Sequence, residues 1–283
     1  MVARILPICL LFCLINQVQA QITVVDDTGV KIELDVPPEK IVSLAPHLTE
    51  LLFSIGVGNK IVGTVRFSDY PNAARSIPVL GDAFVINLES ILFLDPDIVV
   101  AWHTGGVNNI IGKLRELGIP VFVNHTSDLE GIGSSAKQLG LLVGEREQGL
   151  LLEKKFLSTL HSISESKADL KKNVFFQISD QQLYTVNDTH LIGQAISACG
   201  GSNIFGGSEV PVPIVSKESI LVANPDIIII SNGNSGRESP WVEEWTKLDG
   251  YHAKIRFIDA ALISRPSMRM LQGINELCRI ISL

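Results

Sequence analysis

Two glutamates occupy matching positions in a stretch of sequence that occurs twice. Residues 88–100 read LESILFLDPDIVV, and residues 217–229, 129 positions later, read KESILVANPDIII. Glu89 and Glu218 therefore each begin a short amphipathic segment that leads through a turn into an apolar run. Each glutamate lies just after a candidate helix cap, where the helix dipole alone favours a carboxylate. The alternative is a pair of equivalent carboxylates that contact a partner molecule, and the residues themselves favour neither interpretation.

Trp102 and His103 end the apolar run of the first copy, at a place suited to ligand binding. The carboxyl ends of parallel strands line the ligand crevice of α/β sheets, and a tryptophan there offers a large apolar face. His103 follows it, and the sequence leaves open whether this histidine touches a cobalt or iron centre; we expect no metal ligand here. The other histidines are scattered, and neither cysteine beyond residue 20 has metal ligands at a suitable spacing, so we expect no zinc or manganese site. These histidines are His47, His125, His161, His190 and His252.

The sequence offers little that would support catalysis. It contains no Gly-x-Ser-x-Gly nucleophile elbow and no Gly-x-x-x-x-Gly-Lys phosphate loop. Gly56 and Gly58 are followed by Gly63, a spacing that does not match the dinucleotide-binding fingerprint. We therefore expect a binding protein without a resident cofactor, and an enzyme is the less favoured alternative.

The composition indicates an exported, soluble, acidic protein. Residues 1–20 combine Arg4, an apolar core and a small-residue cleavage site, the pattern of a signal peptide. Its removal leaves 263 residues with 22 basic and 30 acidic side chains, a net charge of −8, which argues against nucleic acid as a partner. No later apolar stretch is long enough to span a bilayer. Cys199 and Cys278 remain, and an even count in an exported chain indicates one disulfide, with two buried free thiols as the alternative.

Strands alternate with helices along the chain, which predicts α/β architecture with parallel sheets. A hairpin over 22–36 comes first. A fainter similarity joins residues 47–63 to residues 190–206, so that both halves contain related units and two lobes with a cleft between them are expected. Strands are expected over 41–44, 61–65, 97–102, 121–124, 174–178, 226–231 and 256–259, and helices over 49–55, 107–117, 129–142, 190–198, 238–248 and from Ser264 or Pro266 onward.

A long segment from residue 145 to residue 172 carries apolar residues at helical spacing, with no proline and no glycine after Gly149. We expect one continuous helix here, long enough to cross from one lobe to the other; an ordinary surface helix of the first lobe is the alternative. The expected organisation is a signal peptide (1–20), an N-terminal lobe (21–145), an interdomain helix (146–172) and a C-terminal lobe (173–283).

Four motifs follow one another in an order typical of one family. They are FSDYP at 67–71, NLESI at 87–91 with Pro96-Asp97 and Ala101-Trp102 after it, CGGSNIF at 199–205, and VSKE at 215–218. In these motifs the chain resembles the periplasmic siderophore, haem and cobalamin receptors of ABC importers, and among them the vitamin B12 (cobalamin) binding members.

The resemblance implies two Rossmann-like lobes joined by one long helix, a small hinge motion and a Cys199–Cys278 disulfide. It also implies a periplasmic monomer that hands its ligand to an inner-membrane ABC permease dimer with its ATPase. In that family the glutamates matching Glu89 and Glu218 dock onto arginines of the two permease subunits. One carboxylate on each lobe suits a two-fold symmetric partner.

The resemblance further implies a corrin-contacting tryptophan at Trp102 and an aromatic residue at Phe67. Elsewhere the chain departs from the cobalamin pattern: Ala83, Val212 and Ile178 replace aromatic residues, with Phe84 beside Ala83 as a substitute. The expected ligand is cobalamin or a related corrinoid; haem or a ferric siderophore is the alternative. Further candidate ligand residues are Tyr70, Tyr184, Ala261, Leu262, Ile263, Ser264 and Arg265, and Trp241 and Trp245 could supply compensating faces.

Overall fold

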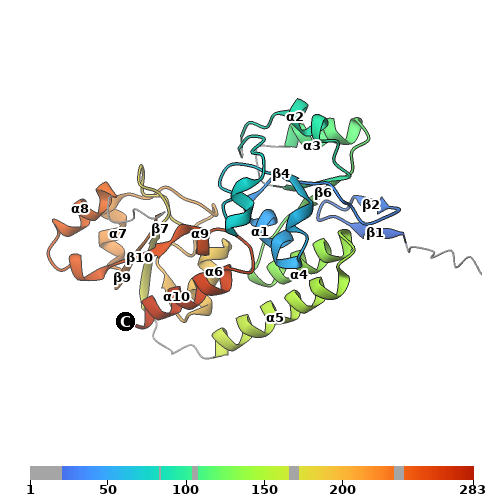
Figure 1. Ribbon diagram of the computed structural model, residues 1–283. Coiled ribbons are helices and arrows are strands. Elements are labelled where there is room, and N and C mark those ends of the chain that lie inside the picture. The colour runs from blue at the N-terminus through green and yellow to red at the C-terminus, as the bar shows by residue number, and fades with distance from the viewer. Residues whose placement is uncertain (1–20, 83, 104–107, 166–171, 233–238) are drawn as a thin grey trace, which may run out of the picture.

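The computed structural model describes residues 21–82, 84–103, 108–165, 172–232 and 239–283. Two lobes stand side by side on a layer of long helices (Figure 1). The expected signal peptide, Ala83 and the end of the expected interdomain helix lie outside the described residues. No helix in the described ranges combines the length and apolarity needed to cross a membrane.

The N-terminal lobe is built on a four-stranded parallel sheet in the order β4-β3-β5-β6. One face of this sheet packs on α1 and α4, and the other packs on α2 and α3. The hairpin expected over 22–36 is present as an antiparallel pair beside this sheet. The strands of the N-terminal lobe are β1 (Ile22–Val25) and β2 (Lys31–Leu34) of the hairpin, and β3 (Ile41–Ser43), β4 (Ile61–Gly63), β5 (Ile98–Trp102) and β6 (Val121–Asn124) of the sheet.

The C-terminal lobe repeats this topology in the order β8-β7-β9-β10, again with every pair parallel. Numbered within each lobe, both sheets run 2-1-3-4, which agrees with the internal repeat. One face packs on α6 and α10, and the other packs on α7 and α8. The strands are β7 (Asn173–Gln177), β8 (Ser202–Asn203), β9 (Ile227–Asn232) and β10 (Ile255–Asp259).

The two copies of the repeated stretch adopt one local structure. Helices α2 and α7 both end at a residue in the left-handed region, Asp95 with φ 48° and Asn224 with φ 43°. The aspartate two positions later then accepts a hydrogen bond from the amide that leads into the first strand of the lobe: Asp97 from Lys40 at 2.8 Å, and Asp226 from Asn173 at 2.7 Å. The repeat in the sequence is therefore also a repeat in the structure.

The helices match the expected ones closely in the first lobe and less closely near the C-terminus. Proline at the first turn lets α1 begin three residues before the expected start. Short 3-10 turns occupy Gly58–Lys60, Asn72–Ser76 and His252–Lys254. The helices are α1 (Pro46–Ile55), α2 (Leu88–Leu94), α3 (Asn108–Glu116), α4 (Leu129–Leu142), α5 (Arg146–Glu165), α6 (Leu191–Ala198), α7 (Lys217–Ala223), α8 (Pro240–Thr246), α9 (Ala260–Ile263) and α10 (Met270–Ser282).

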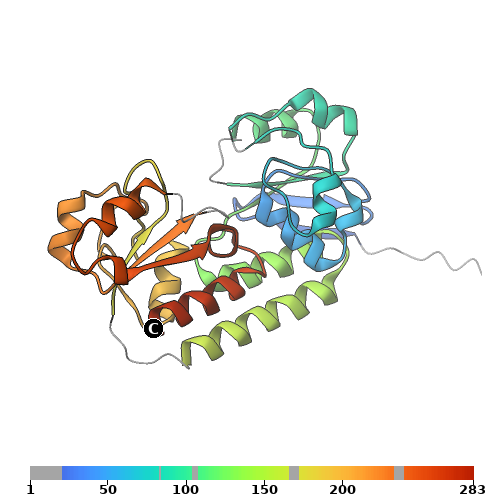
Figure 2. The same cartoon turned by 60° about the vertical axis from the view of Figure 1, so that its left-hand side comes forward.

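Helix α5 spans both lobes, as the expected interdomain helix would. Its residue Leu152 belongs to the core of the first lobe, whereas Phe156 and Leu160 belong to the core of the second. The antiparallel neighbour α4 crosses as well, because Ile132 lies in the second core and Leu139 in the first. Figure 2 shows these helices, with α10 beside them, along the base of both lobes. Two crossing helices are present where the sequence predicted one.

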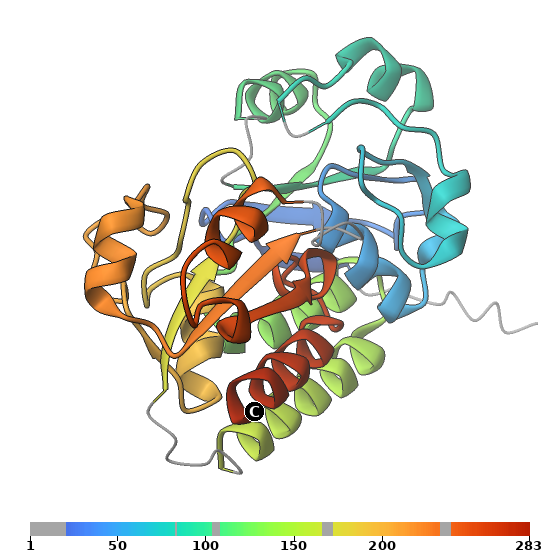
Figure 3. The ribbon, with the colours of Figure 1, turned by 90° about the vertical axis from the view of Figure 1, so that its left-hand side faces the viewer.

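The expected start of the last helix was wrong. The chain forms the short helix α9 after β10, turns through residues 264–269, and enters α10 only at Met270. The side chains of this turn bind the first lobe, and those contacts hold it out of the helical conformation. Figure 3 shows α10 running next to α5 below the second sheet.

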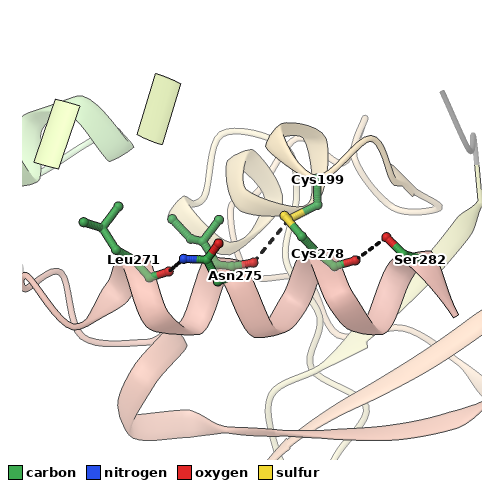
Figure 4. The surroundings of a disulfide bond; sticks show 6 residues. Cys199, Leu271, Asn275, Cys278 and Ser282 are labelled. Carbon is green, nitrogen blue, oxygen red and sulfur yellow. Dashed lines mark hydrogen bonds between the residues drawn. A yellow bond between two sulfur atoms is a disulfide. The ribbon is translucent and has the colours of Figure 1, made fainter. Parts of the chain in front are cut away.

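Cys199 and Cys278 form a disulfide that closes 79 residues, which confirms the expected pairing. Cys199 caps the end of α6 and Cys278 lies in α10, so the bond joins two helices on the same face of the second sheet (Figure 4). The fold that results is two similar lobes, bridged by helices and covalently reinforced on one side.

Candidate functional site

Two adjoining cavities lie where the lobes face each other. The first has a volume of about 410 Å³ and a mainly apolar lining from the first lobe, closed by the segment after α9. The second, of about 570 Å³, has a charged lining from both lobes. Phe67, Ser264 and Arg265 line both, so the two cavities adjoin each other, and we call them together the interlobe site. The first is lined by Leu44, Ala45, Pro46, His47, Val65, Arg66, Phe67, Asp82, Phe84, Trp102, Ser264, Arg265 and Pro266.

Three aromatic side chains give the first cavity its apolar surface. Trp102 reaches it from the carboxyl end of β5, as the strand-end rule predicts. Phe67 and Phe84 line the same cavity from loops and are 68% and 83% exposed. Large aromatic side chains that stay this open to solvent are suited to covering the apolar face of a ligand.

Local backbone structure holds the two phenylalanines in place. Phe67 has φ 68°, in the left-handed region that phenylalanine rarely adopts, so its loop is fixed by surrounding contacts. Phe84 follows a tight turn in which Asp82 accepts hydrogen bonds from the amides of Phe84 and Val85, at 2.9 and 3.0 Å. Gly81 permits that turn, because a Cβ atom there would lie 2.1 Å from the Val85 carbonyl oxygen.

His47 supports the apolar wall in its neutral form. Its ring meets the Trp102 ring edge to face, with centroids 5.5 Å apart and an interplanar angle of 83°. Burial lowers the pKa of His47 to about 4; a polar contact with Asn124 acts against this shift, and the Arg265 charge adds to it. An uncharged imidazole therefore backs Trp102 at neutral pH.

A network of charged and polar side chains joins the lobes at the second cavity. Glu50 of α1 is only 2% exposed and accepts hydrogen bonds from Arg265 at 2.9 Å and from Arg269 at 3.1 Å. The Ser267 hydroxyl donates to its other carboxylate oxygen at 2.5 Å. Arg265 also binds Asp69 at 2.7 Å. We call Glu50, Asp69, Arg265, Ser267 and Arg269 the interlobe network.

The interlobe network shifts the pKa values of Arg265 and Asp69 in the directions that favour their charged forms, and it contacts an aromatic side chain. Burial alone would lower the pKa of Arg265, but its hydrogen bonds to Asp69 and Glu50 raise it. Burial alone would raise the pKa of Asp69, but the hydrogen bond and charge of Arg265 lower it. The guanidinium of Arg269 stacks on the Tyr70 ring at 3.8 Å. Tyr70 therefore lines the second cavity in a position set by the opposite lobe.

Of this network only Arg265 is among the candidate ligand residues expected from the sequence; Glu50, Ser267 and Arg269 are not. A signal for Glu50 was available, because this carboxylate stands among Leu48, Leu51 and Leu52 in a helix with an apolar stripe. A charged residue at such a position is rarely buried unless it is paired.

The structure brings together seven of the ten candidate ligand residues, namely Phe67, Tyr70, Phe84, Trp102, Ala261, Ser264 and Arg265. The expectation for Ile263 does not fit, because its side chain is fully buried in the second core. Leu262 and Tyr184 line neither cavity.

Other candidates named from the sequence also lie apart from the interlobe site. Trp245 packs in the core against Phe175 and Trp241, so it offers no face to a ligand. Ile178, Val212 and His103 are not part of either lining. His103 stacks edge-on against His125 instead, with ring centroids 5.2 Å apart. Among the described residues, no group of three or more His, Cys, Asp or Glu side chains could hold a metal ion.

Glu89 and Glu218 lie on equivalent helices and are both exposed. Their helices are capped alike: the Asn87 side chain accepts from the Ser90 amide at 2.9 Å, and the Ser216 hydroxyl accepts from the Ser219 amide at 3.1 Å. Helices α2 and α7 cover the sheet faces that point away from α1 and α6. The two carboxylates thus occupy matching outer surfaces of the two lobes.

Two similar lobes bridged by helices, with a ligand-sized site between them, define a solute-binding protein of the helical-backbone kind. The chain belongs to the periplasmic binding protein family, whose model matches residues 41–251. It is similar to the vitamin B12-binding protein of Vibrio vulnificus, with 32% identity over 246 residues that cover 86% of this chain and 89% of the relative.

Solved structures of periplasmic binding proteins have the same fold. The crystal structure of the periplasmic vitamin B12 binding protein of Vibrio cholerae has a TM-score of 0.78 and 30% identity, and covers 87% of this chain and 98% of that one. The periplasmic heme binding protein of the same species shares the fold with a TM-score of 0.76 at 20% identity, covering 86% of this chain and 99% of that one.

Proposed function

We propose that this chain is a periplasmic solute-binding protein that captures vitamin B12 (cobalamin) or a related corrinoid between its lobes. The observation that carries the proposal is the interlobe site, where aromatic side chains face a cavity in a chain 32% identical to vitamin B12-binding proteins. The apolar first cavity suits the corrin face, and the charged second cavity suits the polar amide and phosphate groups of cobalamin. The protein holds its ligand without converting it.

The binding energy comes from burial, against a flat ligand, of the exposed Phe67 and Phe84 side chains and of the open part of the half-buried Trp102. Each aromatic side chain offers roughly 150–250 Å² of surface, or about 4–6 kcal/mol gross at about 25 cal/mol/Å². Ordering costs consume part of this, and a nanomolar affinity needs about 12 kcal/mol net. Phe67, Phe84 and the open part of Trp102 therefore supply a large share of this energy, and polar contacts in the second cavity supply the rest.

The exposed glutamates on the outer surfaces of the lobes mediate delivery of the ligand to a membrane transporter. Glu89 and Glu218 dock onto basic side chains of an inner-membrane ABC permease dimer, which its ATPase powers. Exposed ion pairs are worth about 0–1 kcal/mol each, so these two contacts guide encounter and orientation more than they set affinity. The chain acts as a monomer in the periplasm after its signal peptide (1–20) is removed.

Isothermal titration calorimetry tests the choice of ligand. Cyanocobalamin and cobinamide should bind with submicromolar dissociation constants, whereas haemin and ferric siderophores should bind at least about a hundredfold more weakly. Tight binding of haemin or of a siderophore, with weak or no binding of both corrinoids, would replace the proposal by its alternative. Release of a chemically altered ligand would indicate an enzyme.

A pair of tryptophan variants tests the site. Trp102→Ala should weaken cyanocobalamin binding about 10- to 100-fold, as expected when a central aromatic contact is lost. Trp241→Phe is the matched control, because Trp241 packs against Trp245 in the second lobe and lines neither cavity. Equal affinities for both variants would place the ligand elsewhere.

A further inference from the structure

The two most exposed large apolar side chains in the described part of the molecule occupy equivalent positions of the internal repeat. Phe93 is 90% exposed and Val222 is 87% exposed. They are separated by 129 residues, the period of the repeat. A single exposed apolar residue is ordinary on a protein surface. Two that are nearly fully exposed at matching places on two lobes indicate a shared role.

Each apolar residue shares a helix face with a glutamate. Phe93 follows Glu89 by four residues in α2, and Val222 follows Glu218 by four residues in α7, so each pair is about one helical turn apart on the solvent side. The buried side of each helix is fixed by Ile91 or Ile220, both with no exposed surface. Each lobe therefore presents one carboxylate and one apolar side chain along one outward strip.

The two strips lie over corresponding faces of the two sheets. Helix α2 covers one face of the first sheet, and the crossing helices lie on the other. Helix α7 stands in the same relation to the second sheet. In Figure 1 the two helices are carried by different lobes, so no single small molecule could engage both strips. A partner that contacts both must itself present two similar surfaces.

We infer that Phe93 and Val222 are apolar docking residues that insert into two equivalent recesses of the ABC permease dimer, each recess beside the basic group that meets the glutamate. The inference rests on the proposed function, which supplies the permease. It extends that function by assigning the duration of the complex to an apolar pair. Charges speed encounter and lose effect in salt, whereas buried apolar contacts mainly slow dissociation.

The experiment measures association and dissociation rates of the full chain, loaded with cyanocobalamin, on the permease–ATPase complex of the source organism in lipid nanodiscs. We expect Phe93→Ser to raise the dissociation rate about tenfold and Val222→Ser about fivefold, at both 0.1 M and 0.5 M NaCl. Glu89→Gln with Glu218→Gln should instead lower the association rate, and mainly at 0.1 M. Leu151→Ser is the matched control, since Leu151 is exposed on α5, away from α2 and α7.

The outcomes separate the inference from the function on which it rests. If charge reversal at Glu89 and Glu218 abolishes binding while the Phe93→Ser/Val222→Ser double variant dissociates like the wild type, the apolar pair has no docking role. If the wild type does not bind the permease at all, docking and the inference both fail. Analytical ultracentrifugation tests the other possible partner of the two strips, a second copy of the chain. A dimer formed by the wild type but not by the double variant would assign the strips to self-association and overturn the inference. Cyanocobalamin affinity, measured by calorimetry, should be the same in all variants.

Discussion

Glu50→Gln should destabilise the folded protein strongly, although Glu50 touches neither interlobe cavity. The carboxylate lies in α1 with 2% of its surface exposed, and two guanidinium groups and a hydroxyl from the second lobe bind it. Glutamine has the same shape but no charge. The substitution therefore leaves Arg265 and Arg269 partly buried without the carboxylate that compensates both of them.

The expected loss follows from the burial of each partner. Removing one member of a buried, hydrogen-bonded ion pair costs about 3–5 kcal/mol, because the remaining charge stays desolvated. Asp69 binds the same arginine, but its side chain is 46% exposed, so Asp69→Asn should cost no more than about 1 kcal/mol. The structure thus predicts a difference of about 2–4 kcal/mol between two substitutions that each remove one negative charge beside Arg265.

Urea denaturation followed by circular dichroism measures both variants, with free energies taken from the midpoint and slope. Combining Glu50→Gln with Arg265→Gln tests the pairing directly. The double variant should lose less stability than the sum of the single losses, by about 1–3 kcal/mol. The reasoning would be refuted if Glu50→Gln cost under about 1 kcal/mol, or if it cost the same as Asp69→Asn.

The remaining predictions concern pH, the disulfide and the helix crossing. The pKa of His47 is about 4 in the folded protein against 6.5 ordinarily, so between these pH values the unfolded chain binds more protons than the folded one. The unfolding free energy should therefore fall by about 3 kcal/mol as the pH drops from 7 to below 4. His47→Gln should flatten this profile, and an unchanged profile would contradict the role of His47. Replacing Cys199 and Cys278 by serine should lower the unfolding free energy in urea by about 4–5 kcal/mol, since the bond closes 79 residues; a loss under 1 kcal/mol would contradict this. Gly140→Ala places a Cβ atom 2.7 Å from the backbone of α5 and should cost about 1–3 kcal/mol in thermal unfolding, whereas an unchanged melting temperature would show that the helices can separate.

Much of the fold could be predicted because local signals and tertiary structure agree over most of the chain. The helix expected over 129–142 is α4 at the same residues, and the structure shows Asp128 as its cap. The end of the chain could not be predicted in this way. Ser264 and Pro266 resemble a helix start, but Arg265 and Ser267 bind Glu50, more than 200 residues earlier in the sequence. Contacts at that separation leave no local signature.

The candidate site was predictable where chain topology determines it. A strand end in a parallel sheet places Trp102 at the crevice whatever surrounds it. Hydrophobic residues elsewhere are ambiguous, because the sequence does not say whether an aromatic or aliphatic side chain faces a core or a cavity. Trp245 and Ile263 prove to be core residues for this reason. The pairing of Glu50 with the opposite lobe could not be predicted from the sequence, although the sequence does show a carboxylate among the apolar residues of this helix.

The crossing of α4 and α5 through both cores determines which part of the chain can fold by itself. Ile132 of the first half completes the core of the second lobe, and Leu152 of α5 completes that of the first. A cut at residue 145 would leave the N-terminal fragment with an uncovered apolar surface, and the C-terminal fragment without part of its interior. The cooperative unit is therefore the entire polypeptide, and exchange of one lobe with a homologous receptor would disturb a core whichever lobe kept the two crossing helices.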